Sequence, residues 1–139
     1  MKDREGLTPA LPSPEPYRRY IFDLTGGGRK SGKATGPMDP EFYRFVRAQE
    51  VWDRAFATHM AREVKPDGPL VVGIIGQGHL QWGGGVSWQL ADLGVRSAYV
   101  SVPQMQEDAL FREGAADFVF RLPEREAKTE ENAQVVERA

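Results

Sequence analysis

His79 stands where a reactive side chain is most useful in an α/β protein. The residues before it, 70–75, form an uncharged, largely β-branched run that predicts a central strand covered on both faces. Gly76 and Gly78 follow, and they allow the backbone to turn sharply as the strand ends. Ligands of open α/β sheets bind beyond the carboxyl ends of the strands. We therefore expect His79 to be a ligand, a general base or a histidine that holds the loop.

A long amphipathic helix is predicted over residues 39–64. Asp39 and Pro40 suit its cap and first turn, and residues 65–68, Lys-Pro-Asp-Gly, would end it. At helical spacing its large apolar residues share one face: Phe42, Phe45, Val46, Trp52, Phe56 and Met60. The opposite face is polar: Arg44, Arg47, Arg54, Thr58 and Arg62.

Gln49 and Asp53 interrupt the apolar face of this helix. A buried carboxylate without partners costs several kcal/mol, so Asp53 must meet hydrogen-bond donors, a cation or a metal. The backbone N–H groups of a glycine loop are the simplest donors, and Asp53 would then fix that loop.

Other sites that the sequence suggests carry weaker signals. Residues 83–85, Gly-Gly-Gly, precede a predicted helix over 86–93 and could offer backbone N–H groups to a carboxylate or propionate. The sequence around His79 lacks the third glycine of the dinucleotide fingerprint, which argues against such a cofactor. His59 lies at the edge of the long helix's apolar face, but no metal-binding spacing of histidines and carboxylates is present.

Composition excludes several classes of function. The chain has 139 residues, a net charge of −2 and scattered basic residues, so no nucleic-acid partner is expected. It contains no cysteine, which excludes disulfides and thiolate chemistry. No apolar run approaches the roughly 20 residues that cross a bilayer, and no signal peptide follows Met1.

Three segments are predicted along the chain. Residues 1–38 should form an extended Pro-rich arm, a short helix from about Pro14 to Leu24 capped by Ser13, and a flexible Gly/Lys loop over 26–37. Residues 39–123 should form an α/β domain, and 124–139 a polar carboxyl-terminal tail.

The expected fold class is α/β, with a small, mainly parallel three-stranded sheet flanked by helices. Besides 70–75, strands are predicted at 96–102 and 117–121, with a helix over 104–113 between them. Strands separated by helices of this length form parallel βαβ units. So small a sheet leaves its edges exposed, which favours a homodimer or a missing amino-terminal half.

Two motifs in order resemble a known family. Ala48-Gln49-Glu50-Val51-Trp52-Asp53 is followed by Gly76-Gln77-Gly78-His79-Leu80 and then by the glycines 83–85 and Val86. This arrangement, over about 39–103, resembles the carboxyl-terminal half of the ChaN-like haem-binding uptake family, which is related to the Tiki and erythromycin-esterase superfamily.

The resemblance implies a haem-binding protein of iron uptake at the bacterial envelope or periplasm, often dimeric. It implies that Gln49, Asp53, Gly78 and His79 form a polar cluster, with Asp53 facing His79. Family members usually carry an aromatic residue, often tyrosine, where this chain has Gly84, and often a histidine where it has Trp88. Their amino-terminal Gly-Glu-x-His motif has no match in residues 1–38.

Two hypotheses follow for the function. In the first, the chain binds haem or another flat apolar ligand without catalysis. His79 would be the polar contact and the metal ligand, beside Trp82, Trp88 and Phe56. In the second, the chain is a remnant of a hydrolase of the same superfamily, with His79 as base and Asp53 orienting it. A degenerate domain kept for assembly is a further alternative.

Overall fold

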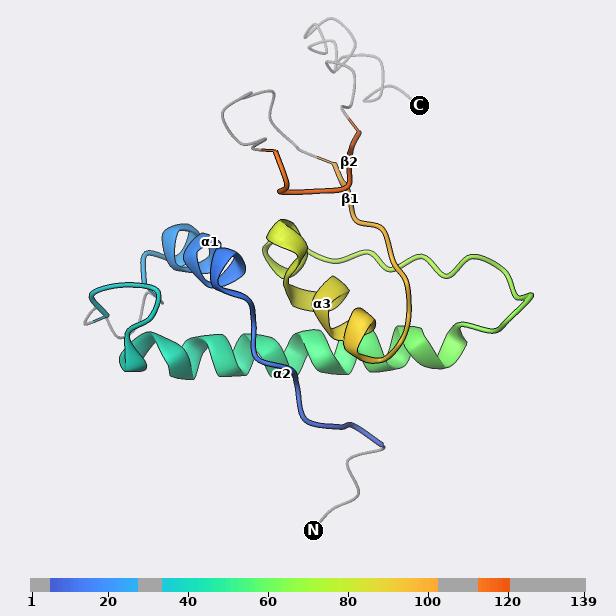
Figure 1. Ribbon diagram of the computed structural model, residues 1–139, viewed down its shortest axis with the longest axis horizontal. Helices are drawn as coiled ribbons and strands as arrows, with labels where there is room; N and C mark the ends of the chain where they lie inside the picture. Colours follow the sequence, from blue (N-terminus) through green and yellow to red (C-terminus); the bar gives the residue numbers. More distant parts are fainter. Residues whose placement is uncertain (1–5, 28–33, 103–112, 121–139) are drawn as a thin grey trace, which may run out of the picture.

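The longest element is the helix α2, Pro40–Glu63, in a computed structural model that describes residues 6–27, 34–102 and 113–120 (Figure 1). Its limits agree with the predicted ones within a residue. The Asp39 side chain caps it by accepting a hydrogen bond from the Glu41 amide at 2.8 Å. Asp39 also accepts hydrogen bonds from the amide and hydroxyl of Thr35, and these donors lower the pKa of its carboxyl.

The buried face of α2 differs from the predicted apolar face. Trp52 is 72% exposed, whereas Arg54, expected on the solvent side, is 4% exposed. The buried residues of the helix are Phe42, Val46, Glu50, Asp53, Arg54, Ala57 and Thr58. Phe42, Val46 and Asp53 are buried as predicted, but more than half of the buried residues are polar because the segments packed on α2 supply polar partners, so hydrophobic periodicity assigned the face only in part.

Two shorter helices, α1 (Glu15–Thr25) and α3 (Gly85–Asp92), both pack against α2 (Figure 1). The helix α1 starts one residue later than expected. Its cap position is Pro14 and carries no side-chain cap, so the prediction that Ser13 caps the helix is wrong. The helix ends at Thr25, and the residue that follows, Gly26, adopts the left-handed conformation that is common at a helix C-terminus.

Among the described residues, two apolar clusters lie along α2. One joins α1 to the first half of α2 through Tyr17, Ile21, Phe42 and Val46. The other joins α3 to the second half through Ala57, Val86 and Leu90. The helices α1 and α3 therefore pack against consecutive parts of the long helix α2.

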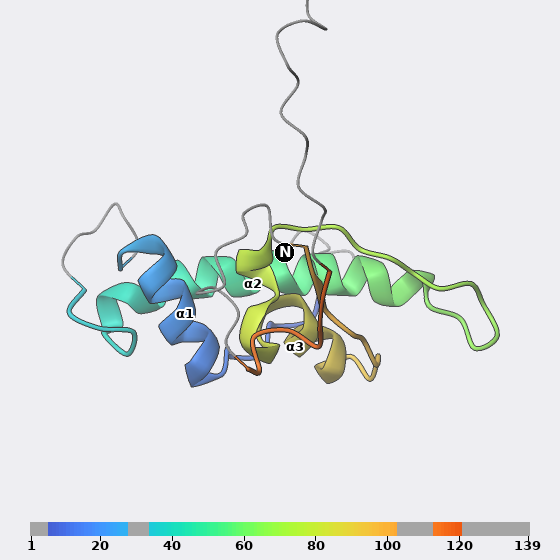
Figure 2. The same cartoon turned by 90° about the horizontal axis from the view of Figure 1, so that it is seen from above.

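The predicted central strand at 70–75 is not a strand. The segment is extended and returns alongside α2 (Figures 1 and 2), and no backbone hydrogen bond joins it to another described residue. Leu70 and Ile74 are 88% and 91% exposed. Gly73 packs so closely on α2 that a Cβ there would lie 2.6 Å from the Met60 sulfur. The prediction failed because a β-branched run becomes a strand only beside a partner strand.

The sheet of the described residues has two strands where three were predicted. Strands β1 (Val100–Ser101) and β2 (Phe118–Val119) pair in parallel, with Val100 opposite Phe118. The parallel direction was predicted correctly, although both strands are shorter than expected. The predicted helix at 104–113 falls almost wholly outside the described residues, as do the core of the Gly/Lys loop and the tail 124–139. Within the described part of the chain, no helix is long and apolar enough to span a membrane.

Candidate functional site

His79, which follows the extended segment, contacts Asp53 of α2. His79 ends a single 3₁₀ turn, η1 (Gln77–His79), whose first hydrogen bond runs from the His79 amide to the Gly76 carbonyl. Its Nδ1 lies 2.7 Å from Oδ1 of Asp53. The prediction that Asp53 faces His79 is confirmed, and the functional role of the pair stays a prediction.

Asp53 is fully buried, and side chains satisfy it. Its Oδ1 contacts His79 and its Oδ2 accepts a hydrogen bond from the Tyr17 hydroxyl at 3.2 Å. Burial raises the pKa of its carboxyl, and the contacts with His79 and Tyr17 oppose that rise. The expectation that Asp53 would accept backbone N–H groups of the glycine loop is therefore wrong, because among the described residues its partners are a histidine and a tyrosine.

Gln49 lies beside the same imidazole. Its Nε2 is 2.8 Å from Nδ1 of His79 and 3.3 Å from Nε2. When Nδ1 donates its proton to a hydrogen bond with Asp53, the lone pair of the ring is on Nε2. The Gln49 amide nitrogen is closer to Nδ1 than to Nε2, so it packs against the imidazole and is not a directed donor to that lone pair.

Tyr17 completes this cluster, and sequence reasoning missed it. It comes from α1, its ring is fully buried, and its hydroxyl lies 3.0 Å from the Gly78 carbonyl as well as 3.2 Å from Asp53. Burial, followed by the charge of Asp53, raises the pKa of the phenol. A tyrosine within a short predicted helix carries no signal for a polar partner 36 residues away.

A family model described as "Haem-binding uptake, Tiki superfamily, ChaN" matches residues 1–90. The chain belongs to this ChaN family. The match begins well before residue 39, where the sequence resemblance was placed, so it includes α1 and Tyr17 as well as His79. Neither a curated protein nor a solved structure matches the chain.

The second glycine run of this ChaN-family chain makes room for the site. A Cβ on Gly84 would overlap the Tyr17 ring, and one on Gly85 would overlap the carbonyl group of His79. Gly85 also has φ +57°, which favours glycine. Tyr17 thus fills the space above Gly84, the position at which the resemblance led us to expect an aromatic side chain. Close packing accounts for both glycines, and the anion role predicted for them stays a prediction.

The two tryptophans that were expected beside His79 have other neighbours. The Trp82 amide donates to the Ala115 carbonyl at 3.1 Å, and the Trp88 indole donates to the Pro12 carbonyl at 3.0 Å. No hydrogen bond or ring contact within the described ranges joins either of them to His79. Their role in ligand binding stays a prediction.

Exposed apolar side chains border the His79 cluster on α2 instead. Phe45 precedes Gln49 by four residues and Trp52 follows it by three, so all three lie along one stripe of the helix. Phe45 is 38% exposed and Trp52 is 72% exposed. On the α1 side, the half-exposed Leu24 lies close to Gly78. Exposed apolar side chains of α2 therefore flank Gln49, the residue that contacts the imidazole.

Proposed function

We propose that this chain binds haem and that Nε2 of His79 is the iron ligand. The observation that carries the proposal is the 2.7 Å contact between Nδ1 of His79 and the buried carboxylate of Asp53. Histidines that bind metals usually donate their second N–H to a carboxylate or carbonyl, which fixes the tautomer and makes the free nitrogen more basic. The His79 side chain is 29% exposed, so a ligand can reach it.

The residues around His79 fit the needs of haem. Because the porphyrin supplies most of the ligands of haem iron, a single histidine such as His79 would be enough to hold it. The Gln49 amide is 3.3 Å from Nε2 and nearer to Nδ1, so it would leave the Nε2 lone pair available to iron. The exposed rings of Trp52 and Phe45 offer apolar surface to the macrocycle. Bound haem would supply redox and ligand-exchange chemistry, while Asp53 and Tyr17 would hold the imidazole in place.

The wider role that we propose is haem or iron handling during uptake, in keeping with the description of the family. We place it at the bacterial envelope and propose that two copies associate. Support for association comes from the exposed apolar residues of the extended segment, Leu70, Val72 and Ile74, which leave apolar surface that a second copy can cover.

A hemin titration of the purified chain tests the proposal. We expect a Soret shift that saturates at one haem per chain in the wild type and a loss of affinity of tenfold or more in His79→Ala. His59→Ala is the matched control, because His59 is an exposed histidine on α2 away from the cluster. Unchanged hemin affinity in His79→Ala, or no Soret shift with the wild type, would overturn the assignment.

A further inference from the structure

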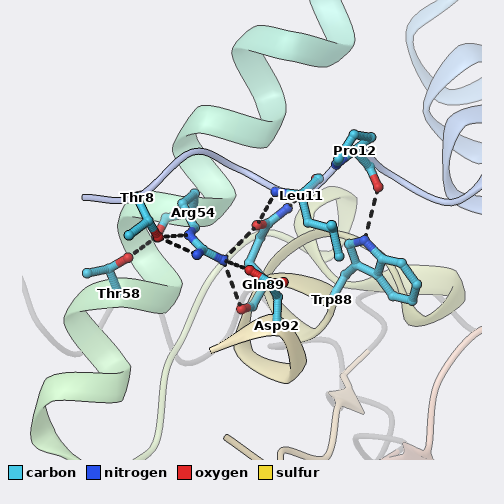
Figure 3. A network of polar contacts seen from close by, with 8 residues as sticks. All are labelled: Thr8, Leu11, Pro12, Arg54, Thr58, Trp88, Gln89 and Asp92. Atoms are coloured by element: carbon cyan, nitrogen blue, oxygen red, sulfur yellow. Dashed lines mark hydrogen bonds and ion pairs between the residues drawn. The ribbon is translucent and has the colours of Figure 1, made fainter. Parts of the chain in front are cut away.

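Hydrogen bonds to its backbone groups hold the segment that precedes α1. Residues 8–13, which we call the strap, lie across α2 and α3 (Figure 3). The Leu11 amide donates to Oε1 of Gln89 at 3.0 Å, and Nε2 of Gln89 donates to the Leu11 carbonyl at 2.7 Å. The Gln89 side chain thus forms hydrogen bonds with both the amide and the carbonyl of Leu11, as a residue of a neighbouring β-strand would.

Contacts on either side of Leu11 continue this pattern. The Trp88 indole donates to the Pro12 carbonyl at 3.0 Å, and the Ser13 amide donates to Oε1 of Glu50 at 2.7 Å. At the other end, the Arg54 guanidinium donates to the Thr8 hydroxyl (Figure 3). These hydrogen bonds of Leu11, Pro12 and Ser13 all involve backbone groups, which any extended peptide offers.

Three of the side chains that hold the strap, those of Glu50, Arg54 and Gln89, are buried. Glu50 and Gln89 are each 1% exposed. Arg54 joins the two helices, since its guanidinium contacts Oδ2 of Asp92 at 2.6 Å and Oε1 of Gln89 at 3.2 Å. Buried polar groups are costly unless they are satisfied, and here the strap supplies several of the partners. The surface between α2 and α3 is therefore arranged as a peptide-binding site.

The strap leads directly into the His79 cluster. Ser13 precedes Tyr17 by four residues, and their partners on α2, Glu50 and Asp53, are three residues apart. Glu50 therefore accepts the hydrogen bond from the end of the strap, and Asp53, one helical turn further along α2, accepts the hydrogen bond from the Tyr17 hydroxyl. A shift of the strap must move the start of α1 and with it Tyr17.

We propose that the α2–α3 surface is a binding site for extended peptide backbone, that the strap is its ligand within the chain, and that strap binding holds Tyr17 against Asp53 and Gly78. Gln89 and Trp88 are then positioning residues for the His79 cluster, which they do not touch. The proposal concerns the chain without haem and stands whether or not haem binds.

NMR of the full chain without haem tests the coupling. In Gln89→Met we expect the Leu11 and Ser13 amides to exchange at least tenfold faster than in the wild type, because their protection depends on strap binding. The ring resonances of Tyr17 and His79 should shift in the same variant, while the methyl resonances of Ala57, Val86 and Leu90 stay in place. Asp92→Asn is the control, since it weakens the contact with Arg54 and leaves Leu11, Pro12 and Ser13 paired.

The NMR results test the coupling to Tyr17 separately from the strap itself. Fast strap amides with unmoved Tyr17 and His79 resonances would overturn the coupling, and unprotected Leu11 and Ser13 amides in the wild type would overturn the strap itself. If Gln89→Met loses the core methyl resonances, Trp88→Phe provides the same test, because it removes a single hydrogen bond at the exposed side of the strap. Failure of the wild type to bind hemin would leave these NMR results unaffected.

Discussion

At the scale of single residues, the site depends on one buried carboxylate with two side-chain partners. Asp53 was singled out in the sequence because a carboxylate in an apolar arc demands an explanation, and His79 because of its place after two glycines. Both inferences came from local chemistry. Tyr17 could not be found in this way, because a tyrosine at helical spacing looks the same whether or not its hydroxyl reaches a polar partner in the fold.

Tyr17→Phe should destabilise the chain by about 1–3 kcal/mol, because a buried acceptor is left with fewer donors. The Tyr17 hydroxyl that this substitution removes lies within hydrogen-bond distance of two acceptors, the Asp53 carboxylate and the Gly78 carbonyl. Urea unfolding measures the effect. Tyr20→Phe is the control, since the buried Tyr20 hydroxyl has no hydrogen-bond partner among the described residues and its removal should be neutral or stabilising. Equal losses in the two variants would contradict the role of the Tyr17 hydroxyl.

Gly85→Ala should destabilise the chain more than Gly83→Ala does. Both glycines have positive φ, at +57° and +62°, so each alanine pays a similar backbone penalty of about 1–2 kcal/mol. Only at Gly85 does the added Cβ overlap the His79 carbonyl, whereas the space around Gly83 is open. The difference between the two unfolding free energies therefore measures the steric term alone. Hemin titration should also show weaker binding for Gly85→Ala, and equal stability of the two variants would refute the close approach.

At the scale of elements, helices were easier to predict than strands. The limits of α2 follow from a cap, a proline and a Pro-Gly break, which are signals contained in a few neighbouring residues. The buried face of α2 was predicted only in part, because Arg54 and Glu50 are buried by partners from α3 and the strap. The run 70–75 was mispredicted because strand formation depends on a partner strand that no local pattern can reveal.

The cap of α2 gives this helix a pH dependence. The pKa of Asp39 is lowered from its ordinary value of 3.8 by the Thr35 and Glu41 donors, so its contribution is complete above that value and is lost as pH falls through the lower pKa of the folded state. Asparagine caps as well as aspartate but does not titrate there. The difference in urea midpoint between the wild type and Asp39→Asn should therefore be constant from about pH 5 to about pH 7 and change below about pH 4. A difference that stays constant down to about pH 2 would show that Asp39 is not held by these donors.

At the scale of the whole molecule, α2 is a support on which distant parts of the chain meet. The strap, α1, the extended segment and α3 all contact α2, and the contacts of the strap, α1 and α3 join residues that are far apart in the sequence (Figures 1 and 2). Membership of the ChaN family was recognised from two motifs, since these residues lie in short segments with fixed order. The way those segments converge on His79 is a property of the fold, and only the structure supplies it.

The extended segment 70–75 carries the last prediction, which concerns self-association. Leu70, Val72 and Ile74 face solvent on a segment whose backbone pairs with no other described residue, and both features favour association with another chain. Sedimentation velocity should show the wild type moving towards twice its 15.5 kDa mass as concentration rises. Ile74→Lys should shift the equilibrium towards monomer and leave the unfolding free energy within about 0.5 kcal/mol, because this side chain is almost fully exposed. Met38→Lys adds the same charge at an exposed apolar residue outside the segment, and if it dissociates the protein equally, net charge rather than this segment controls association.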